Sequence, residues 1–587
     1  MWHIGNSCAD TPYPRQHGIL QNSHMTKLRL VDFFCGAGGF SEGFRQQGFE
    51  VVMGIDSWRP AVDTHNLNHH LEDVPRDVLQ FAHSTEAIDK LPDTEVIVGS
   101  PPCFLFSMSN KGGKTDKSHG IRLIEAYLRV IAVKKHKRTS KLHAWFLENV
   151  PNSRKYIRPR YTFRQLGLAK WARSIKKDPD AVAVEISDNS TILNSADYGV
   201  AQKRERFVCG EIIKIGKLEV PEKTQKLYRT LGEVKNGLPK PNSQRNKKTS
   251  VDPNYPNLRL PAEQITDQFY DTGIYEMYWR NAKDYKLNHP YMGRMSFPED
   301  ESKPSRTIMA TRSKSSRESL IYRSEYNRYG NGEFRTPTIR ELACLMGFPI
   351  AYQFTGGEST KWQLVGNAVP PFLSAALAMT VRRTLGLKPI ASNKMSFTPL
   401  LMNHGKVNRL DTYAPKEFDK PPKRKNLSRF RKHPFKVGNM TVALTNYDPS
   451  GEVRRGGTRW YSAVFCSTGK DYAVEVLHPR QFKRLETIIL KNQGEQGRRF
   501  VREFDSHFHE ALENVDRMQY AYENPSHSRK AHDPICLIDD IAEFIQRHDQ
   551  TEQSIHSYRP VAGRSILPLR QLYAMYAINK LISRQTA

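Results

Sequence analysis

Short hydrophobic runs alternate with amphipathic stretches between residue 28 and about residue 210. Four runs have the length of strands, at 30–34, 51–56, 96–98 and 144–147. The stretch 121–133 places apolar residues at helical spacing between the last two runs. Strand-length runs separated by helical stretches are typical of βαβ units. The pattern therefore predicts a doubly wound α/β sheet.

The regular pattern breaks down between residues 212 and 303. This stretch is rich in Asn, Pro, Lys and Tyr, which predicts a small irregular domain or a long insertion. Regular structure is expected to return at 307–310 and 338–347. A last helix is predicted at 372–385, after Val369-Pro370-Pro371.

A second hydrophobic pattern follows a basic stretch. Residues 415–436 contain Pro421-Pro422-Lys423-Arg424-Lys425 and Arg429-Phe430-Arg431-Lys432, which suit a linker or an arm that follows phosphates. Strands and then helices are expected beyond it, with strands at 441–444, 461–465 and 472–476 and a last helix at 567–582.

Charge and length narrow the class of protein. The 587 residues predict two or three domains, and their net charge of +28 indicates a polyanionic partner. Nucleic acid is favoured over an anionic membrane because no amphipathic anchor stands out. No hydrophobic run approaches transmembrane length, and the first 24 residues lack the pattern of a signal peptide. Met25 is an alternative start.

The seven cysteines are scattered and never spaced Cys-x-x-Cys. A disulfide framework or a zinc site is therefore not expected, and a reducing, intracellular setting fits. His507 and His509 beside Glu510 have side chains that ligate metals. Without a further ligand cluster, a solvated helix face is the favoured interpretation, and no metal is predicted.

Candidate chemistry follows the predicted strands, whose carboxyl ends form the binding edge of such a sheet. The turn Gly36-Ala37-Gly38-Gly39 lets backbone approach a ligand, although it could be a simple tight turn. Asp56 and Asp77 follow at intervals that favour an adenosine-type cofactor. Gly99-Ser100-Pro101-Pro102-Cys103 places a thiol on a stiff loop after the third strand. Cys103 is a candidate nucleophile, and a buried cysteine that acts as a small hydrophobe is the alternative.

Five ordered motifs resemble those of DNA (cytosine-5) methyltransferases over residues 28–387, apart from the irregular insertion. They are Asp32-Phe33-Phe34-Cys35-Gly36-Ala37-Gly38-Gly39-Phe40, Pro101-Pro102-Cys103, Glu148-Asn149-Val150, Gln202-Lys203-Arg204-Glu205-Arg206 and Gly366-Asn367-Ala368-Val369-Pro370. The resemblance implies S-adenosylmethionine as methyl donor and cytosine in double-stranded DNA as substrate, with the cytosine flipped out of the duplex.

The implied fold class is α/β, a Rossmann-like S-adenosylmethionine-dependent methyltransferase sheet with an inserted target recognition region and a separate C-terminal α+β domain. The expected organisation is a disordered lead (1–26), a catalytic and cofactor-binding domain (27–211), a target recognition region (212–303), a return to the catalytic domain (304–390), a basic linker (391–436) and a C-terminal domain of unknown role (437–587).

The resemblance also implies roles for individual residues. Cys103 is the nucleophile, Glu148 holds or donates a proton near ring N3, and Arg204 and Arg206 hold the ring oxygen and a nearby phosphate. The cofactor is assigned to Phe34, Gly36, Gly38, Gly39, Asp56, Asp77, Pro102, Leu123 and Asn367. DNA contact or its support is assigned to Ser107, Gln202, Arg306 and Thr307.

One departure from the family pattern is Phe104-Leu105, where a polar residue and a small residue are usual. Alternatives therefore stay open: an RNA cytosine-5 methyltransferase, or a catalytically weak DNA-binding regulator. We expect a cytoplasmic monomer that associates with the nucleoid through DNA, acting alone or with a restriction or defence partner. The target sequence and the role of residues 437–587 cannot be read from the sequence.

Overall fold

The computed structural model divides the chain into two compact units, the first made of residues up to Ala414 apart from 112–115 and 275–277, and the second mainly of residues from Pro415 onward. It describes residues 28–103, 106, 117–243, 247–274, 276–288, 293–311, 313–326, 333–391, 430–437, 440–448, 459–467, 472–476, 479–513, 515, 517–524, 532–549, 554–556 and 566–583. The two units are described separately below.

The first unit is built on a six-stranded sheet of order β2-β1-β3-β4-β8-β7. Its strands are β1 (Arg29–Phe33), β2 (Glu50–Ile55), β3 (Val96–Gly99), β4 (Ala144–Asn149), β7 (Ser190–Asn194) and β8 (Glu205–Ile212). The first four pair in parallel, while β8 is antiparallel to both of its neighbours. The carboxyl ends of β1, β3 and β4 therefore meet at one edge, beside the start of β8. Each predicted strand agrees with its observed strand to within one or two residues.

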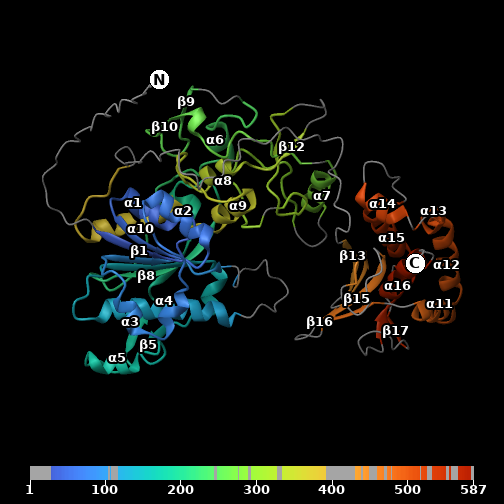
Figure 1. The fold of residues 1–587 in the computed structure, drawn as a ribbon, viewed down its shortest axis with the longest axis horizontal. Coiled ribbons are helices and arrows are strands. Elements are labelled where there is room, and N and C mark those ends of the chain that lie inside the picture. Colours follow the sequence, from blue (N-terminus) through green and yellow to red (C-terminus); the bar gives the residue numbers. More distant parts are fainter. Residues whose placement is uncertain are drawn as a thin grey trace, which may run out of the picture. The chain divides into compact units, whose positions relative to one another are not determined.

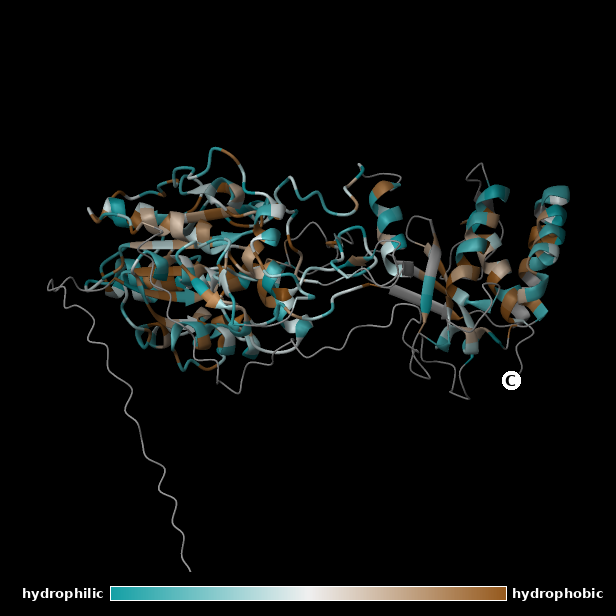
Figure 2. Ribbon diagram, turned by 90° about the horizontal axis from the view of Figure 1, so that it is seen from above, coloured by the Kyte–Doolittle hydropathy of each residue, from teal (hydrophilic) through white to brown (hydrophobic). Residues whose placement is uncertain are grey.

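Helices cover both faces of this sheet, as Figure 1 shows. One face carries α1 (Gly39–Gln46), α2 (Arg59–His69) and α10 (Pro371–Thr384), and the other carries α3 (Thr85–Asp89) and α4 (Ser118–His136). Figure 2 shows the hydrophobic residues concentrated in the strands and on the helix faces that meet them. Two buried clusters lie on the two faces, one around Tyr127 and one around Phe44. This is the predicted Rossmann-like sheet.

The region between β8 and α10 contains the stretch 212–303, which is irregular as predicted, and the helices that follow it. Its elements are short: α6 (Leu231–Asn236), β9 (Thr249–Val251), β10 (Arg259–Pro261), α7 (Glu276–Leu287), β11 (Tyr322–Arg323), β12 (Phe334–Arg335), α8 (Ile339–Leu345) and α9 (Glu358–Asn367). Buried ion pairs supply order where regular structure is sparse: Lys361 with Asp267, and Arg335 with Glu341. The prediction of regular structure at 307–310 is wrong, because this segment forms neither helix nor strand.

Smaller elements complete the first unit. They are the 3₁₀ helices η1 (Val78–Ala82), η3 (Pro151–Lys155), η4 (Ser195–Tyr198) and η5 (Ala262–Gln264), the strands β5 (Arg160–Thr162) and β6 (Val182–Glu185), and helix α5 (Ala169–Ser174). These short helices and strands lie in the segments between the main strands and helices of the first unit.

The second unit has its own sheet and core. Strands β13 (Arg431–Val437), β14 (Met440–Thr445), β15 (Tyr461–Ser467) and β16 (Tyr472–Val476) form an antiparallel sheet in chain order. Helices follow: α11 (Pro479–Asn492), α12 (Gly494–His507), α13 (His509–Glu513), α14 (Arg517–Glu523), α15 (Pro534–His548) and α16 (Leu569–Ile582), with the hairpin β17 (Ser554–His556) and β18 (Ile566–Pro568). The predicted helix 567–582 therefore begins two residues later, after β18. Buried residues of α16 run through one hydrophobic cluster with the sheet and the other helices.

One stretch of the described chain, Glu358–Thr384, is long and apolar enough to cross a membrane by length and composition. This stretch corrects the sequence prediction that no hydrophobic run approaches transmembrane length. The stretch comprises α9 and α10, and 83% of its most apolar window is buried inside the protein, as in a core helix.

Two buried histidines of α2 lie beneath the glycine-rich turn. His65 Nε2 lies 2.9 Å from Ser41 Oγ, and that hydroxyl donates to Asp32 Oδ2 at 2.7 Å. The His69 ring packs against that of His65 at a tilt of 47°, with 4.6 Å between their centroids. Burial lowers the pKa of His69 to about 3, because the charged ring would lose its hydration. The folded protein therefore holds His69 neutral.

Acidification is expected to destabilise the first unit through His69. In the unfolded chain this residue takes up a proton near pH 6.5, whereas in the folded protein its pKa is about 3. The contribution of His69 to the free energy of unfolding is thus complete above about pH 6.5 and is lost as the pH falls towards 3. Between pH 7 and pH 5 the loss is about 2 kcal/mol. Urea unfolding at both pH values measures it. His69→Gln should reduce this loss and His83→Gln, at an exposed position, should not; equal losses in both variants would contradict the assignment.

Candidate active site

A cavity of about 390 Å³ opens at the carboxyl ends of β1, β3 and β4. Predicted site residues among its lining residues are Phe34, Gly36, Asp56, Asp77, Pro102, Cys103, Leu123, Glu148, Arg206 and Asn367. The topology brings them together, because each follows a strand end or lies on an element that covers this edge. Its size is in the range of small-molecule sites.

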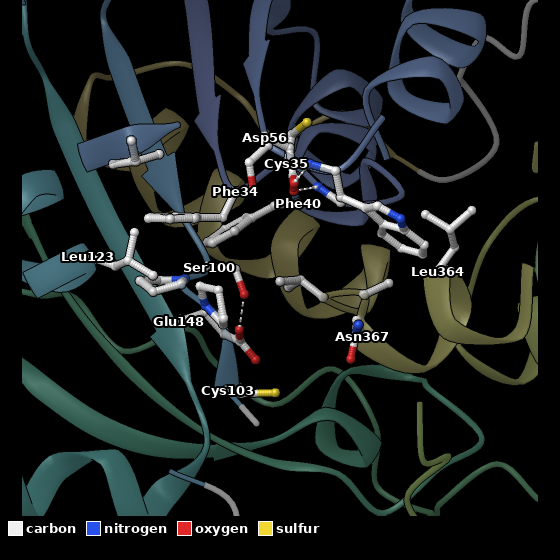
Figure 3. Close-up of a pocket in the computed structure, with 18 of the residues that line it drawn as sticks. Phe34, Cys35, Phe40, Asp56, Ser100, Cys103, Leu123, Glu148, Leu364 and Asn367 are labelled. Carbon is white, nitrogen blue, oxygen red and sulfur yellow. Dashed lines mark hydrogen bonds between the residues drawn. The ribbon is translucent and has the colours of Figure 1, made fainter. Parts of the chain in front are cut away.

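One end of the cavity is organised by Asp56, directly after β2. Its carboxylate accepts hydrogen bonds from the backbone N–H of Gly36 at 3.1 Å and of Trp58 at 2.8 Å (Figure 3). Burial raises the pKa of Asp56, and these backbone hydrogen bonds oppose that effect. Gly36 has a φ of +53°, a conformation that glycine adopts readily. The glycine turn and Asp56 therefore form one preformed unit.

Gly38 and Gly39, which the resemblance assigns to the cofactor, are not among the described residues that line the cavity. A Cβ on Gly39 would lie 2.0 Å from the carbonyl oxygen of Val369. A Cβ on Gly38 would lie 2.6 Å from the Tyr352 hydroxyl, and its φ is +84°. Both glycines are needed because backbone and side chains from the far end of the unit pack against the turn.

The loop that carries Cys103 is held by backbone and amide hydrogen bonds. Ser100 N donates to Phe33 O at 3.1 Å, and Asn149 Nδ2 donates to Pro101 O at 3.0 Å. The N–H of Phe106 returns to the Cys103 carbonyl at 3.0 Å. The thiol therefore has a defined position, at the edge where Glu148 also ends its strand. Phe104 and Leu105 lie outside the described residues.

Glu148 is held on both of its oxygens. Oε1 pairs with Arg206 Nε at 2.8 Å, and Oε2 accepts from Ser100 Oγ at 2.5 Å (Figure 3). Cys103 lies in the same cavity, and burial raises the pKa of its thiol. Arg206 and, more weakly, Arg204 oppose this effect, because a nearby cation favours the thiolate. The group is thus a thiol, a carboxylate and a guanidinium around one small space.

Arg204, which the resemblance assigns to the substrate, contacts other parts of the first unit. Its buried guanidinium donates to three carbonyls, those of Ile308, Gly366 and Ala368, at 3.3, 2.9 and 3.1 Å. Burial lowers its pKa to about 9. The side chain is absent from the cavity lining and ties β8 to the segment that carries Asn367.

The described residues that the resemblance assigns to DNA also make contacts within the first unit. Gln202 is buried: its Oε1 accepts from Ile308 N at 3.2 Å, and its Nε2 donates to Met346 Sδ at 3.1 Å. Arg306 is held by Glu299 at 2.8 Å, so it supports the irregular region from within. Thr307 Oγ1 donates to Lys203 O at 2.9 Å. Ser107 lies outside the described residues.

Several cavity residues were missed by sequence reasoning. Ser100 precedes the two prolines, and its hydroxyl is placed to bind Glu148. Trp58, two residues after Asp56, adds an aromatic surface, and His119 lies one helical turn before Leu123. The positions of Ser100 and Trp58 after predicted strands were the available signal, while His119 lies just before the helix predicted at 121–133. Among the residues that the structure describes, no group of three or more His, Cys, Asp or Glu side chains suited to a metal was found, His507, His509 and Glu510 included.

A largely parallel sheet with a cavity at its carboxyl edge, and a thiol beside a carboxylate–guanidinium pair, defines a Rossmann-like group-transfer enzyme. The family model described as "C-5 cytosine-specific DNA methylase" matches residues 28–383. The chain therefore belongs to the C-5 cytosine-specific DNA methylase family, and the predicted family is confirmed. It is a DNA cytosine-5 methyltransferase.

Curated relatives agree with this family. The chain is 28% identical over 366 residues to the type II methyltransferase M1.HphI of Haemophilus parahaemolyticus, covering 60% of this chain and 86% of the relative. It is 26% identical to M.HgiDI of Herpetosiphon aurantiacus, covering 61% and 95%. A solved structure of a DNA modification methyltransferase described as putative, from an Escherichia coli prophage, aligns with 19% identity and a TM-score of 0.40, covering 61% of this chain and 100% of that one.

Gly39→Ala is expected to disrupt the site by overpacking. The added methyl group would collide with the Val369 carbonyl, and we expect a loss of more than about 3 kcal/mol in the free energy of unfolding. Gly293→Ala is the control, since no atom of the described residues, its chain neighbours aside, lies within 4 Å of the position that a Cβ would take there, and its effect should stay below about 1 kcal/mol. Denaturant unfolding measures both; a Gly39→Ala protein as stable as the control would refute the packing role.

Proposed function

We propose that this chain methylates carbon 5 of a flipped cytosine in a specific double-stranded DNA sequence, with S-adenosylmethionine as donor and Cys103 as nucleophile. The observation that carries the proposal is the shared cavity of Cys103, Glu148 and Arg206, continuous with the Gly36–Asp56 end. Family membership supplies the reaction class.

The residues at the Asp56 end fit S-adenosylmethionine. Phe34, Trp58 and Leu123 offer aromatic and apolar surface for a base and an aliphatic chain. The Asp56 carboxylate accepts backbone N–H groups on both oxygens, and a carboxylate has lone pairs enough to accept a ribose hydroxyl as well. Asp77 and Asn367 supply further polar groups in the same cavity. When bound, this cofactor supplies an electrophilic methyl group for carbon 5.

The chemistry assigned to Cys103 is addition to carbon 6 of cytosine. The sulfur–carbon bond forms as the electron pair of the C5–C6 double bond moves to carbon 5, which makes that carbon nucleophilic. Arg206 favours the thiolate that burial opposes. Elimination of the thiolate, with loss of the carbon 5 proton to a base, reverses the addition and frees Cys103.

Glu148 and its two partners respond to charge on the base. A carboxyl group beside ring N3 balances the negative charge that develops there by sharing or donating a proton. Ser100 and Arg206 hold it in one orientation, so reorganisation during the reaction is small. Arg206 is the cavity arginine, while Arg204 positions the segment around Asn367.

DNA is the proposed partner, and the enzyme is proposed to act as a cytoplasmic monomer. The cavity is recessed at a sheet edge, which requires the target base to leave the duplex. The net charge of +28 suits the phosphate backbone. The irregular region 212–303, with Arg306 and Thr307 at its border, is the proposed target recognition region, and Ser107 is proposed to contact DNA. The relatives' names support a role as the modification enzyme of a type II restriction-modification system.

Loss of the thiol is expected to abolish methyl transfer. Cys103→Ser should reduce incorporation of labelled methyl into duplex DNA to background and prevent covalent trapping by 5-fluorocytosine DNA. Glu148→Gln should lower the rate by about 10²-fold or more. Cys536→Ser, in the second unit, is the matched control and should retain full activity. Equal transfer by Cys103→Ser and wild type would refute the role of Cys103.

The substrate and target sequence are tested in a separate experiment. Bisulfite sequencing of DNA from cells that express the chain should reveal methylated cytosines in one short sequence context. A parallel assay compares duplex DNA with transfer RNA in vitro. A strong preference for transfer RNA would replace the DNA proposal by the RNA alternative, and DNA binding without methylation would indicate a regulator.

A further inference from the structure

The second unit carries an open cleft of about 810 Å³ that the methyltransferase site does not use. It lies between α12 and α15, whose positions are labelled in Figure 1. Phe544 of α15 joins the two helices, with ring centroids 5.7 Å from Phe500 and 5.8 Å from Phe504. The floor is therefore part of the hydrophobic core and gives the cleft a fixed shape.

The walls of the cleft are mainly hydrogen-bond donors. α12 contributes Gln496, Arg499, Glu503, Ser506 and His507, and α15 contributes Phe544, Arg547 and His548. Arg499, Ser506, His507 and Arg547 are exposed to solvent. Two guanidinium groups with a hydroxyl and an imidazole are the groups that proteins use to bind phosphate.

Glu503 is the carboxylate among the described lining residues, and it is already paired. Arg499 Nε donates to Glu503 Oε1 at 2.7 Å, and His548 Nε2 lies 2.9 Å from Glu503 Oε2. Arg499 is thereby oriented through its Nε, which leaves its two terminal nitrogens for a ligand. The carboxylate thus aligns the arginine instead of filling the cleft.

Two carbonyls near the C-terminus of α15, where an anion would be repelled, accept side-chain hydrogen bonds. His548 Nδ1 donates to Phe544 O at 2.9 Å, and Gln496 Nε2 donates to His548 O at 3.2 Å. Arg547 lies over the Phe544 ring at 5.9 Å, and His507 stacks on the same ring with centroids 5.7 Å apart. Packing on the Phe544 ring limits the motion of the Arg547 guanidinium and of the His507 imidazole.

We propose that the α12–α15 cleft binds a phosphate of the DNA backbone, so that the second unit holds the duplex at a position separate from the base-flipping site. This proposal rests on the proposed function, which makes DNA the ligand. Contacts of this kind add affinity without selecting a sequence. They explain why a unit with no part in the cavity lining carries oriented arginines.

The test measures binding of a labelled duplex to the full chain by fluorescence anisotropy at several salt concentrations. Arg499→Gln/Arg547→Gln should weaken binding by roughly fivefold to tenfold and reduce the slope of log affinity against log salt by about 1. The matched control is Arg498→Gln/Arg502→Gln, which removes equal charge from the α12 face that pairs with Glu495. This control variant should change the DNA affinity and the salt slope much less. Equal effects of the two double variants, or none from the first, would overturn the proposal.

Two further arms separate other outcomes. At constant ionic strength, inorganic phosphate should compete with DNA for the wild type more than for Arg499→Gln/Arg547→Gln; phosphate binding without any change in DNA affinity would mean a small-anion site and refute the proposal. Arg547→Lys keeps the positive charge and serves as a second variant in case the double variant fails to fold. It should retain most of the DNA binding. Methyl transfer at saturating DNA should be unchanged by the cleft variants. If all cleft variants bind DNA as tightly as the wild type and the wild type transfers methyl groups, the cleft proposal alone is refuted. If the cleft variants bind DNA more weakly but the wild type transfers no methyl groups, the proposed function alone is refuted.

Discussion

The close approach of two chain segments more than 300 residues apart organises the first unit. Helix α1 meets α10 through glycines: a Cβ on Gly43 would lie 2.3 Å from Pro371 O, and one on Gly39 would lie 2.0 Å from Val369 O. Arg204 adds a second tie, since its guanidinium binds carbonyls on either side of Asn367. These contacts fix Asn367 and its neighbours over the edge where Asp56 and Cys103 follow their strands. The cavity exists because the start and the end of this unit are held backbone to backbone.

Burial and charge are balanced differently at the two ends of the cavity. At one end Asp56 is held by backbone N–H groups, which stabilise a carboxylate without bringing in a counter-ion. At the other end Glu148 is matched by a guanidinium, and the same cation offsets the effect of burial on the Cys103 thiol. Only Arg206 of the arginine pair lines this space. Arg204 serves the architecture, and replacing it would disturb the site through Asn367 rather than through a lost contact to the base.

The second unit follows a different principle. Its helices are strongly amphipathic, as the alternating colours along them in Figure 2 show, and one buried helix, α16, joins sheet and helices in a single hydrophobic cluster. The arginines Arg498, Arg499 and Arg502 of α12 pair with carboxylates of the same helix, which orients their side chains. The proposed phosphate contact would give this unit a role in affinity, apart from the chemistry of the first unit.

Sequence alone determined the strands of the main sheet, the family, and the residues that must meet at its carboxyl edge. It did so because strand periodicity and short motifs are local, and because parallel topology places strand ends together. Phe34, Asp56, Cys103, Glu148 and Arg206 were found in this way. The tertiary structure alone decided which motif residues face the cavity. Gly38, Gly39, Gln202 and Arg204 lie in the same motifs, yet they pack against Val369, Tyr352, Met346 and distant carbonyls. Such contacts depend on how remote segments meet, and no local pattern records that.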